Sequence, residues 1–333
     1  MHKPFIIFIF VFINCVICNE ITPISPKNWA KPYSPFYDAA CNRLLMVDFA
    51  NGTLINYNLK SQIIYESRIP GISNPSFMIP IKCRKNKFLV SNGLSTAIIK
   101  WNGVEPEAQV VETLFSVETS QEFINNNWNQ ASVSPQFRFY GGTYRRGMCG
   151  DMPPTTGAVY RYDKCKSVKK IIPNVKVTGG IEWNAKGDTM YFVDPCQKVI
   201  WAYDYIKNTG TIKNGRIVFV YQGGFGDANT IPLGLAIDRK EYLYVTLYGG
   251  GAVLKVDPRT GQIVDVIYVP AEIVSDVTFG GDNYDILFIT TFNSARNIQT
   301  GENSNKTFSP HSGQVFMKMG MNAKGIRSRS VRL

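Results

Sequence analysis

Residues 241–264 (EYLYVTLYGGGAVLKVDPRTGQIV) hold two short apolar segments, each followed by a turn sequence. Within residues 242–247 every second residue is aliphatic, which is typical of a strand with one buried face. Three glycines at 249–251 and the Asp-Pro-Arg-Thr-Gly sequence at 257–261 supply turn conformations. The segment therefore predicts two consecutive strands that form a hairpin.

The same plan of strand, turn and strand recurs five more times in the chain. The further copies are residues 43–59, 86–103, 137–163, 188–205 and 285–319. The centres of the first strands are 43 to 53 residues apart, and almost no helical pattern lies between them. A period in this range with several strands per repeat is typical of a β-propeller. Six copies therefore predict an all-β, six-bladed β-propeller.

In a propeller, the loops that lead into the innermost strands share one face with the loops that join the second and third strands. Ligand sites usually lie on that face, at the mouth of the central channel. We therefore expect any chemistry of this chain at the mouth. The segments that lead into the predicted innermost strands are residues 29–38, 74–81, 126–135, 177–184, 230–238 and 272–281.

The N-terminus has the composition of a secretory signal peptide. Lys3 precedes an apolar run at 4–18, which is short for a membrane span and ends near small residues. We therefore expect a signal peptide at 1–18, a single propeller domain at 19–333, and a secreted, extracellular protein. An uncleaved anchor is the alternative, but no second apolar span follows, so stable membrane insertion is not expected.

Secretion favours disulfides among the five cysteines that remain after residue 18. Cys149 and Cys196 fall in matching loops of adjacent blades on the mouth face, within reach of a bridge. We therefore predict a Cys149–Cys196 disulfide. Cys41, Cys83 and Cys165 are expected towards the opposite face.

The chain carries a formal net charge of +11. Its basic residues are scattered apart from the clusters at 82–87 and 324–333, and neither cluster is interleaved with aromatic residues as a groove for single-stranded nucleic acid would be. We therefore expect no nucleic-acid partner, but a solvated basic surface with weak attraction to anionic glycans or membrane surfaces. N-glycosylation is predicted at Asn51 and Asn305, which begin Asn-Gly-Thr and Asn-Lys-Thr sequences.

The chain contains the longer motifs SPFYD…RLLMVDFANGTLINY, GGIEWNAKGDTMYFVD and IPLGLAIDRKEYLYV. They resemble motifs of the regucalcin/gluconolactonase family, which includes luciferin-regenerating enzymes. The family's opening, Glu-Gly-Pro-x-Trp-Asp…Leu-Tyr-x-Val-Asp-Ile, is similar to SPFYD…RLLMVDFANGTLINY. Its Asn-Gly-Leu-x-Trp-Ser…Tyr-x-x-Asp-Ser is similar to GGIEWNAKGDTMYFVD, and its Pro-Asp-Gly-x-x-x-Asp-x-x-Gly-x-Leu-Trp-Val to IPLGLAIDRKEYLYV. Its last blade is similar to VTFGGDNYDILFITT and GQVFMKMGMNAKGI. The resemblance covers nearly the whole predicted mature chain and implies the same six-bladed fold.

Members of that family that hydrolyse sugar lactones bind one divalent cation at the mouth through a Glu, an Asn and an Asp. Such oxygen ligands suit Ca²⁺, Mg²⁺ or Mn²⁺. The three positions fall here on Tyr33, Gly179 and Leu233, of which only the phenol, with a pKa of about 10, has a donor atom. The family's substrate-contacting Arg and Asn fall on Asn127 and Asn129, so only the Asn is kept. We therefore predict that the family's metal site and its cofactor have been lost.

A few acidic residues and one histidine are candidates for a different metal or catalytic site. Asp194 and Asp227 would form a displaced cation site, for Ca²⁺ for example, although each is also explained as a cap of its own turn. His311 is the one histidine after residue 18 and lies in a polar loop, which is typical of a surface residue rather than of a catalytic triad. Glu182, at the start of an inner strand, is expected in an ion pair.

Aromatic and amide side chains dominate the predicted mouth. Tyr33, Asn127, Asn129 and Trp183 suit a small polyhydroxylated or aromatic ligand, held by stacking and hydrogen bonds, although the same side chains would also serve as a plug. We therefore predict a non-catalytic pseudoenzyme that binds such a ligand, or an extracellular protein or glycan. The alternative is a metal-dependent (Ca²⁺, Zn²⁺ or Mn²⁺) sugar-lactone hydrolase with a displaced site.

Overall fold

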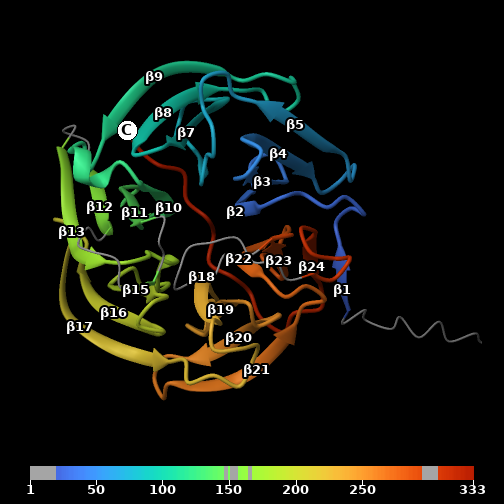
Figure 1. Cartoon of the computed structure of the whole chain (residues 1–333), viewed down its shortest axis with the longest axis vertical. Coiled ribbons are helices and arrows are strands. Elements are labelled where there is room, and N and C mark those ends of the chain that lie inside the picture. Colours follow the sequence, from blue (N-terminus) through green and yellow to red (C-terminus); the bar gives the residue numbers. More distant parts are fainter. Residues whose placement is uncertain (1–19, 146–148, 151–156, 164–166, 295–306) are drawn as a thin grey trace, which may run out of the picture.

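Six four-stranded antiparallel sheets are arranged as a ring around a central channel (Figure 1). The structure, a computed structural model, describes residues 20–145, 149–150, 157–163, 167–294 and 307–333. The chain passes round the ring once, one blade after another, and each innermost strand faces the channel. The six-bladed β-propeller predicted from the repeat is confirmed.

Blades 1 to 3 each use four consecutive strands, with the innermost strand first. Blade 1 consists of β2 (Pro32–Asp38), β3 (Arg43–Asp48), β4 (Thr53–Asn58) and β5 (Ile64–Arg68). Blade 2 consists of β6 (Met78–Pro80), β7 (Lys87–Asn92), β8 (Ser95–Lys100) and β9 (Gln109–Ser116). After the short 3-10 helix η1 (Gln121–Phe123), blade 3 consists of β10 (Asn126–Val133), β11 (Phe139–Arg145), β12 (Gly157–Asp163) and β13 (Ser167–Val175).

Blades 4 and 5 repeat this order. Blade 4 consists of β14 (Ile181–Trp183), β15 (Thr189–Asp194), β16 (Val199–Ile206) and β17 (Thr211–Val220). Blade 5 consists of β18 (Ile231–Ile237), β19 (Leu243–Tyr248), β20 (Ala252–Asp257) and β21 (Gln262–Tyr268). Blade 6 has three strands from the end of the chain, β22 (Val274–Gly280), β23 (Ile286–Thr291) and β24 (Val315–Lys318).

The fourth strand of blade 6 comes from the other end of the chain. β1 (Ile21–Pro23) pairs antiparallel with β24, with Ile21 opposite Lys318, and so closes the ring. The predicted signal peptide at 1–18 lies outside the described residues. Among the described residues no helix is both long and apolar enough to cross a membrane.

Strands in the middle of each blade are buried on both faces. All six residues of β19 are buried, so the alternation at 242–247 does not mark one exposed face, as the sequence pattern suggests. The reason is that the blades pack face to face, and polar side chains such as Thr246 are buried with internal hydrogen bonds. Exposure is concentrated in the outermost strands, such as β21.

The C-terminal segment, residues 324–333, crosses the centre of the ring (Figure 1, red trace). Its bridges lie at the ends of innermost strands, on the face opposite the mouth. Gly325 forms a bridge to Asp238 in blade 5, and Val331 forms one to Ile81 in blade 2. The segment thus spans the end of the channel as a strap. The basic tail expected to be a solvated surface is therefore partly buried, with Val331 fully inaccessible.

Candidate functional site

Four innermost strands are irregular at the places where they pass the channel. The strand register shifts between Tyr33 and Phe36 in β2, between Trp128 and Ala131 in β10, between Pro232 and Leu235 in β18, and between Val274 and Asp276 in β22. Such bulges turn side chains out of the regular pleat and are common next to functional sites. They direct Tyr33, Asn129, Leu233 and Asp276 towards the channel.

The mouth holds a cavity of about 300 Å³, which we call the mouth cavity. All six blades contribute to it, so it lies on the axis of the ring. Its walls are mainly aromatic and amide side chains. The lining residues are Lys31, Tyr33, Phe49, Asn74, Ile124, Asn125, Asn127, Asn129, Tyr144, Val177, Leu233, Tyr248 and Phe292.

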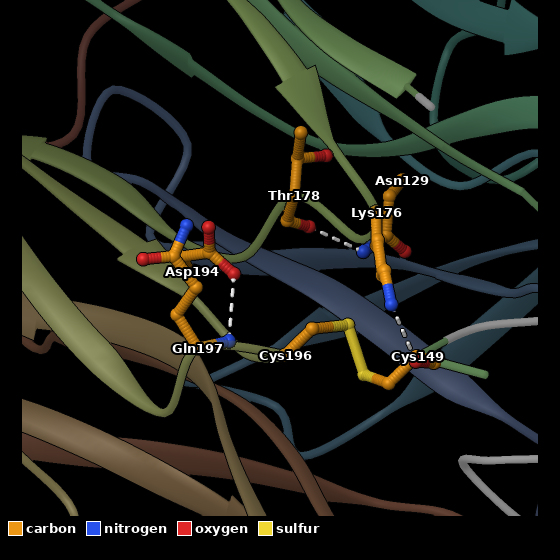
Figure 2. Close-up of a disulfide and its surroundings, with 7 residues drawn as sticks. All are labelled: Asn129, Cys149, Lys176, Thr178, Asp194, Cys196 and Gln197. Carbon is orange, nitrogen blue, oxygen red and sulfur yellow. Dashed lines mark hydrogen bonds between the residues drawn. A yellow bond between two sulfur atoms is a disulfide. The ribbon is translucent and has the colours of Figure 1, made fainter. Parts of the chain in front are cut away.

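Hydrogen bonds fix the polar groups at the base of this cavity. The Tyr33 hydroxyl donates to Asn129 Oδ1 at 3.2 Å, and Asn129 Nδ2 donates to the carbonyl oxygen of Thr178 at 2.5 Å (Figure 2). Burial, and then the nearby carboxylate of Asp276, raises the pKa of the Tyr33 phenol well above its ordinary value. Tyr33 is therefore a neutral, oriented group, whereas the Asn127 amide has no hydrogen bond to the described part of the chain.

Aromatic rings form one wall. The ring of Phe292 packs edge to face against Tyr33, with centroids 5.6 Å apart, and against Tyr248, with centroids 6.3 Å apart. The Lys31 ammonium lies 5.7 Å from the centroid of the same Phe292 ring. Lys31 is a charged residue among the described residues that line the mouth cavity.

Tyr33, Gly179 and Leu233, the positions that the resemblance assigns to the family's metal ligands, lie near this mouth. Tyr33 and Leu233 line the cavity, and the amide of Gly180, next to Gly179, donates to the Leu233 carbonyl at 2.8 Å. A Cβ atom at Gly179 would lie 2.7 Å from that carbonyl oxygen and 2.8 Å from Val193 Cβ. The backbone is thus packed too closely for a side chain at position 179.

The donor set of the mouth cavity does not fit a divalent cation of the family type. Its described lining offers amide and phenol oxygens and one lysine, but no carboxylate. Elsewhere in the described ranges no three His, Cys, Asp or Glu side chains gather as metal ligands would. Hard cations prefer several anionic oxygens, which these residues do not supply.

Trp183 does not reach the mouth cavity, although it was expected to contact a ligand there. Its side chain is fully buried and packs against Tyr140 and Tyr205, with centroid distances of 5.0 and 5.7 Å. Side chains alternate along a strand, so in β14 Glu182 faces the channel and Trp183 faces the interior of the blade stack. The residue of β14 that faces the channel is therefore Glu182, one position away from the predicted contact, and it does not line the mouth cavity.

Asp194 and Asp227 cap turns. Asp194 Oδ1 accepts from the backbone amide of Gln197 at 3.1 Å (Figure 2), and burial raises the pKa of its carboxyl. Asp227 is exposed, and its Oδ1 accepts from the amide of Asn229 at 2.8 Å. Neither lines the mouth cavity. His311 is likewise outside it, with Nδ1 3.1 Å from Gln314 Oε1.

The predicted disulfide is confirmed. Cys149 and Cys196 are bonded, with their Cα atoms 5.2 Å apart, and the bridge joins blades 3 and 4 on the mouth face (Figure 2). Lys176 Nζ donates to the Cys149 carbonyl at 3.1 Å and so ties a third segment to the bridge. Cys41 and Cys83 are free and exposed, whereas Cys165 lies outside the described residues.

The two predicted glycosylation positions differ in what the structure describes. Asn51 lies in the exposed turn between β3 and β4, and its Nδ2 donates to Asp48 Oδ2 at 2.8 Å. Asn305 lies outside the described residues. The turn is exposed and therefore accessible to modification. Glycosylation of Asn51 stays a prediction.

A second, smaller cavity of about 70 Å³ lies deeper in the channel, above the C-terminal strap. Glu182 and Asp276 line it, and Arg329 of the strap enters it from the opposite face. Burial raises the pKa of each carboxyl to about 7, and the positive charge of Arg329 opposes this shift at Glu182. We call this space the inner cavity.

Sequence reasoning did not identify several of the residues that line the two cavities. Phe49 and Phe292 directly follow second strands, and Tyr248 is the last residue of one. The ends of the second strands, where the loops to the third strands begin, were therefore the signal in the sequence that pointed to these residues. Asp276 lies within a segment already expected to face the channel, at a bulge that the sequence pattern does not reveal. Arg329 is distant in sequence from Glu182, with which it lines the inner cavity.

Comparisons with known proteins agree with this architecture. Residues 32–293 match the family model described as "SMP-30/Gluconolactonase/LRE-like region". Regucalcin from Gallus gallus is 26% identical over 299 residues, which cover 88% of this chain and 92% of the relative. Regucalcin from Homo sapiens is 26% identical over 312 residues, which cover 92% and 96%.

Solved structures give the same picture. A luciferin-regenerating enzyme superposes with a TM-score of 0.84 at 25% identity, over 94% of this chain and 99% of that one. A calcium-binding regucalcin from Agrobacterium tumefaciens gives a TM-score of 0.77 at 19% identity, over 93% and 97% of the two chains, and supports the fold alone. The family-model match at 32–293 includes strands of all six blades.

Proposed function

Because the chain belongs to the SMP-30/gluconolactonase/LRE-like family, we propose that it is a member whose metal site has degraded and which binds a small ligand without catalysis. The ligand would occupy the mouth cavity and contact Tyr33, Asn127 and Asn129. Its chemical class is a small polyhydroxylated or aromatic molecule, since aromatic rings and amides line the walls.

The observation that carries this proposal is the packing at Gly179. An asparagine there would place its Cβ within 3 Å of the Leu233 carbonyl oxygen and of Val193, so the backbone of two blades would have to move. At Leu233 itself an aliphatic side chain lines the cavity in place of a carboxylate. Backbone packing as well as residue identity therefore supports the proposed loss of the site.

Energetics support the same conclusion. Moving a dication from water into a partly enclosed cavity without anionic ligands has a large unfavourable desolvation free energy. Coordination by neutral amide and phenol oxygens does not offset it. The Tyr33 phenol stays protonated, because burial raises its pKa, and so it provides no anionic oxygen. A hydrolase with a displaced metal is less well supported, since the Asp194 and Asp227 carboxylates already cap their own turns.

We also propose that the protein is secreted. The apolar run at 4–18 has the length of a signal peptide, and a disulfide within the fold is typical of proteins from oxidising compartments. The exposed position of Asn51 is compatible with a glycan there. Extracellular proteins and glycans are the further partners that this location would allow.

The test is the metal content of the protein purified from a secretory host, followed by titration with Ca²⁺, Zn²⁺ and Mn²⁺. We expect no stoichiometric cation, no rise in Tm and no δ-lactone hydrolysis, since a cation bound only to the folded state would raise stability. A regucalcin treated in parallel serves as the positive control. Turnover of the lactone, with or without a bound cation, would contradict the proposal, and Asp194→Asn and Asp227→Asn would then be the first variants to assay.

A further inference from the structure

Two basic segments that are far apart in the sequence meet on the face opposite the mouth. The loop between β6 and β7 contains Lys82, Arg84 and Lys85, and the C-terminal strap ends beside it (Figure 1). The amide of Lys82 donates to the carbonyl oxygen of Val331 at 2.7 Å, and Arg332 follows directly in the strap. The two basic clusters that are separate in the sequence thus contribute to one surface.

An aromatic ring supports two cations where these segments meet. The Lys82 ammonium lies 3.3 Å from the ring centroid of Phe137, in the loop between β10 and β11, and the Arg332 guanidinium lies 5.1 Å from the same centroid. The amide of Arg332 donates to the Phe137 carbonyl oxygen at 2.9 Å. Contact with a ring stabilises a cation without neutralising it, so both positive charges can still pair with an anion.

Two further lysines face each other across blade 2. Lys87 of β7 is the direct partner of Lys100 of β8 in the strand register. Leu89 and Ile98, each two residues away, pack in the core cluster that includes Phe137, so the two lysines lie on that same side of the blade. Like charges directly opposite each other destabilise a strand pair. A bound anion would relieve this repulsion.

Together these side chains form a surface that we call the basic patch. Its members are Lys82, Arg84, Lys85, Lys87, Lys100 and Arg332. Lys82 and Lys87 are half-buried and the others are exposed. None of them forms an ion pair with a residue in the described ranges, and Asp38 of the neighbouring blade 1 is already paired with Arg43 at 3.0 Å. A surface of cations without ion pairs attracts a polyanion.

Backbone hydrogen bonds fix the chain that carries the patch. The amide of Arg84 donates to the Ile81 carbonyl at 3.2 Å, and the amide of Lys87 donates to the Arg84 carbonyl at 3.1 Å. The amide of Trp101, next to Lys100, donates to the Asn86 carbonyl at 2.9 Å. A surface whose backbone is already ordered loses less conformational entropy when a partner binds. The patch is therefore preformed.

The patch offers charge but no side chain suited to a bilayer or a nucleobase. The exposed large hydrophobic side chains of the described chain lie outside it. Peripheral membrane binding usually adds apolar side chains that enter the lipid, and binding of single-stranded nucleic acid uses exposed aromatic rings for stacking. A sulfated polysaccharide needs neither, because clustered Lys and Arg side chains bind its sulfates through charge-assisted hydrogen bonds.

We propose that the basic patch binds a sulfated polysaccharide, whose sulfate groups pair with its lysine and arginine side chains. The patch and the mouth cavity share no residue, so the two sites are separate. The choice of a glycan among polyanions rests on the proposed secretion, since sulfated polysaccharides are extracellular polymers.

Surface plasmon resonance on immobilised heparin tests the proposal, with the full-length chain purified from a secretory host. Lys87→Gln/Lys100→Gln should weaken binding about tenfold at about 0.15 M NaCl, since two ion pairs with sulfates are lost. The decrease of affinity with salt should also become shallower, because fewer counterions are released on binding. This variant should be at least as stable as the parent, since a like-charge pair is removed, and thermal denaturation measures that.

The matched control is Lys213→Gln/Lys240→Gln. It removes the same charge from exposed positions of blades 4 and 5 and should bind heparin as the parent does. Heparin stripped of its sulfates should bind much more weakly than heparin. Vesicles of phosphatidylserine and phosphatidylcholine, and single-stranded oligothymidylate, are the competing partners and should bind more weakly than heparin.

Four results would overturn the proposal. They are no binding to heparin, an equal loss of affinity in the two double variants, equal binding of desulfated heparin, and tighter binding of vesicles or oligothymidylate that depends on Lys87 and Lys100. The first three reject a sulfate site at the patch, and the fourth assigns the patch to another class of polyanion. Secretion is tested separately, by the appearance of the protein in the culture medium, and the mouth cavity by the cation titration and lactone assay.

Discussion

Glu182 of β14 and Arg329 of the C-terminal strap line the same inner cavity, and each influences the titration of the other. The positive charge of Arg329 lowers the pKa of Glu182, against the larger effect of burial. Burial lowers the pKa of Arg329, and the charge of Glu182 opposes this. The interaction links an innermost strand to the C-terminal strap.

The free energy of unfolding should fall as the pH rises from about 4.5 to about 7. The folded pKa of Glu182 and of Asp276 is raised to about 7, so both carboxyls bind protons more tightly in the folded than in the unfolded protein. Their stabilising contribution is complete below the unfolded pKa and is lost as the pH passes the folded pKa. The change should be on the order of 3 kcal/mol per carboxyl.

Urea denaturation at pH 5 and pH 8 measures this dependence. Asp276→Asn should reduce the difference between the two pH values, because a neutral amide replaces the titrating group. Asp204→Asn serves as the control, since that carboxylate is exposed and paired with Arg216 at the surface. Stability that increases between pH 5 and pH 7 in the parent protein would contradict the assignment.

Arg329→Met should destabilise the protein at pH 8 by about 2 to 3 kcal/mol and much less at pH 5. Removing the guanidinium leaves an ionised Glu182 without its facing cation at high pH, whereas a protonated Glu182 needs none. The matched control is Lys324→Met, an exposed residue of the same strap. An equal loss at both pH values would show that Arg329 acts through packing alone.

Replacing Cys149 and Cys196 together by alanine should lower the free energy of unfolding by about 4 kcal/mol. The bridge closes a loop of 47 residues, and loss of this constraint raises the entropy of the unfolded chain. Single alanine substitutions at the exposed Cys41 and Cys83 are the controls and should have little effect. Chemical denaturation without reductant makes the comparison, and a double variant as stable as the parent would refute it.

Gly179→Ala should destabilise the fold by about 1 to 3 kcal/mol, because its methyl group would lie 2.7 Å from the Leu233 carbonyl oxygen. Asn127→Ala, in the same mouth, creates no such overlap and should change stability by less than about 0.5 kcal/mol. Thermal unfolding of the two variants tests the point. A Gly179→Ala protein as stable as the parent would show that the two blades can separate there and that an asparagine could be accommodated.

The repeat of strand and turn sequences was enough to predict the six-bladed ring, because each blade is built from neighbouring segments. The Cys149–Cys196 bridge was predictable for a related reason: both cysteines occupy equivalent loops of adjacent blades. These features depend on local sequence and on the regular geometry of the fold.

The side chains of the channel were harder to predict, because they depend on irregularities. Trp183 was predicted to line the mouth, but its neighbour Glu182 is the residue that faces the channel. Side chains of consecutive residues in a strand point to opposite faces, so Trp183 packs in the core. Asp276 faces the channel beside a bulge in β22. Arg329 reaches it through a strap whose position depends on bridges to blades 2 and 5.

Pairing of β1 with β24 determines the order in which the ring can form. Each of the first five blades consists of consecutive strands, which pair soon after synthesis because their contacts are local. β1 is the first strand to be synthesised and its partner β24 is the last. Blade 6 is therefore completed only when these two distant segments of the chain meet. Until they meet, β24 is an open edge that a second molecule could occupy, and the last event of folding is also the one most sensitive to protein concentration.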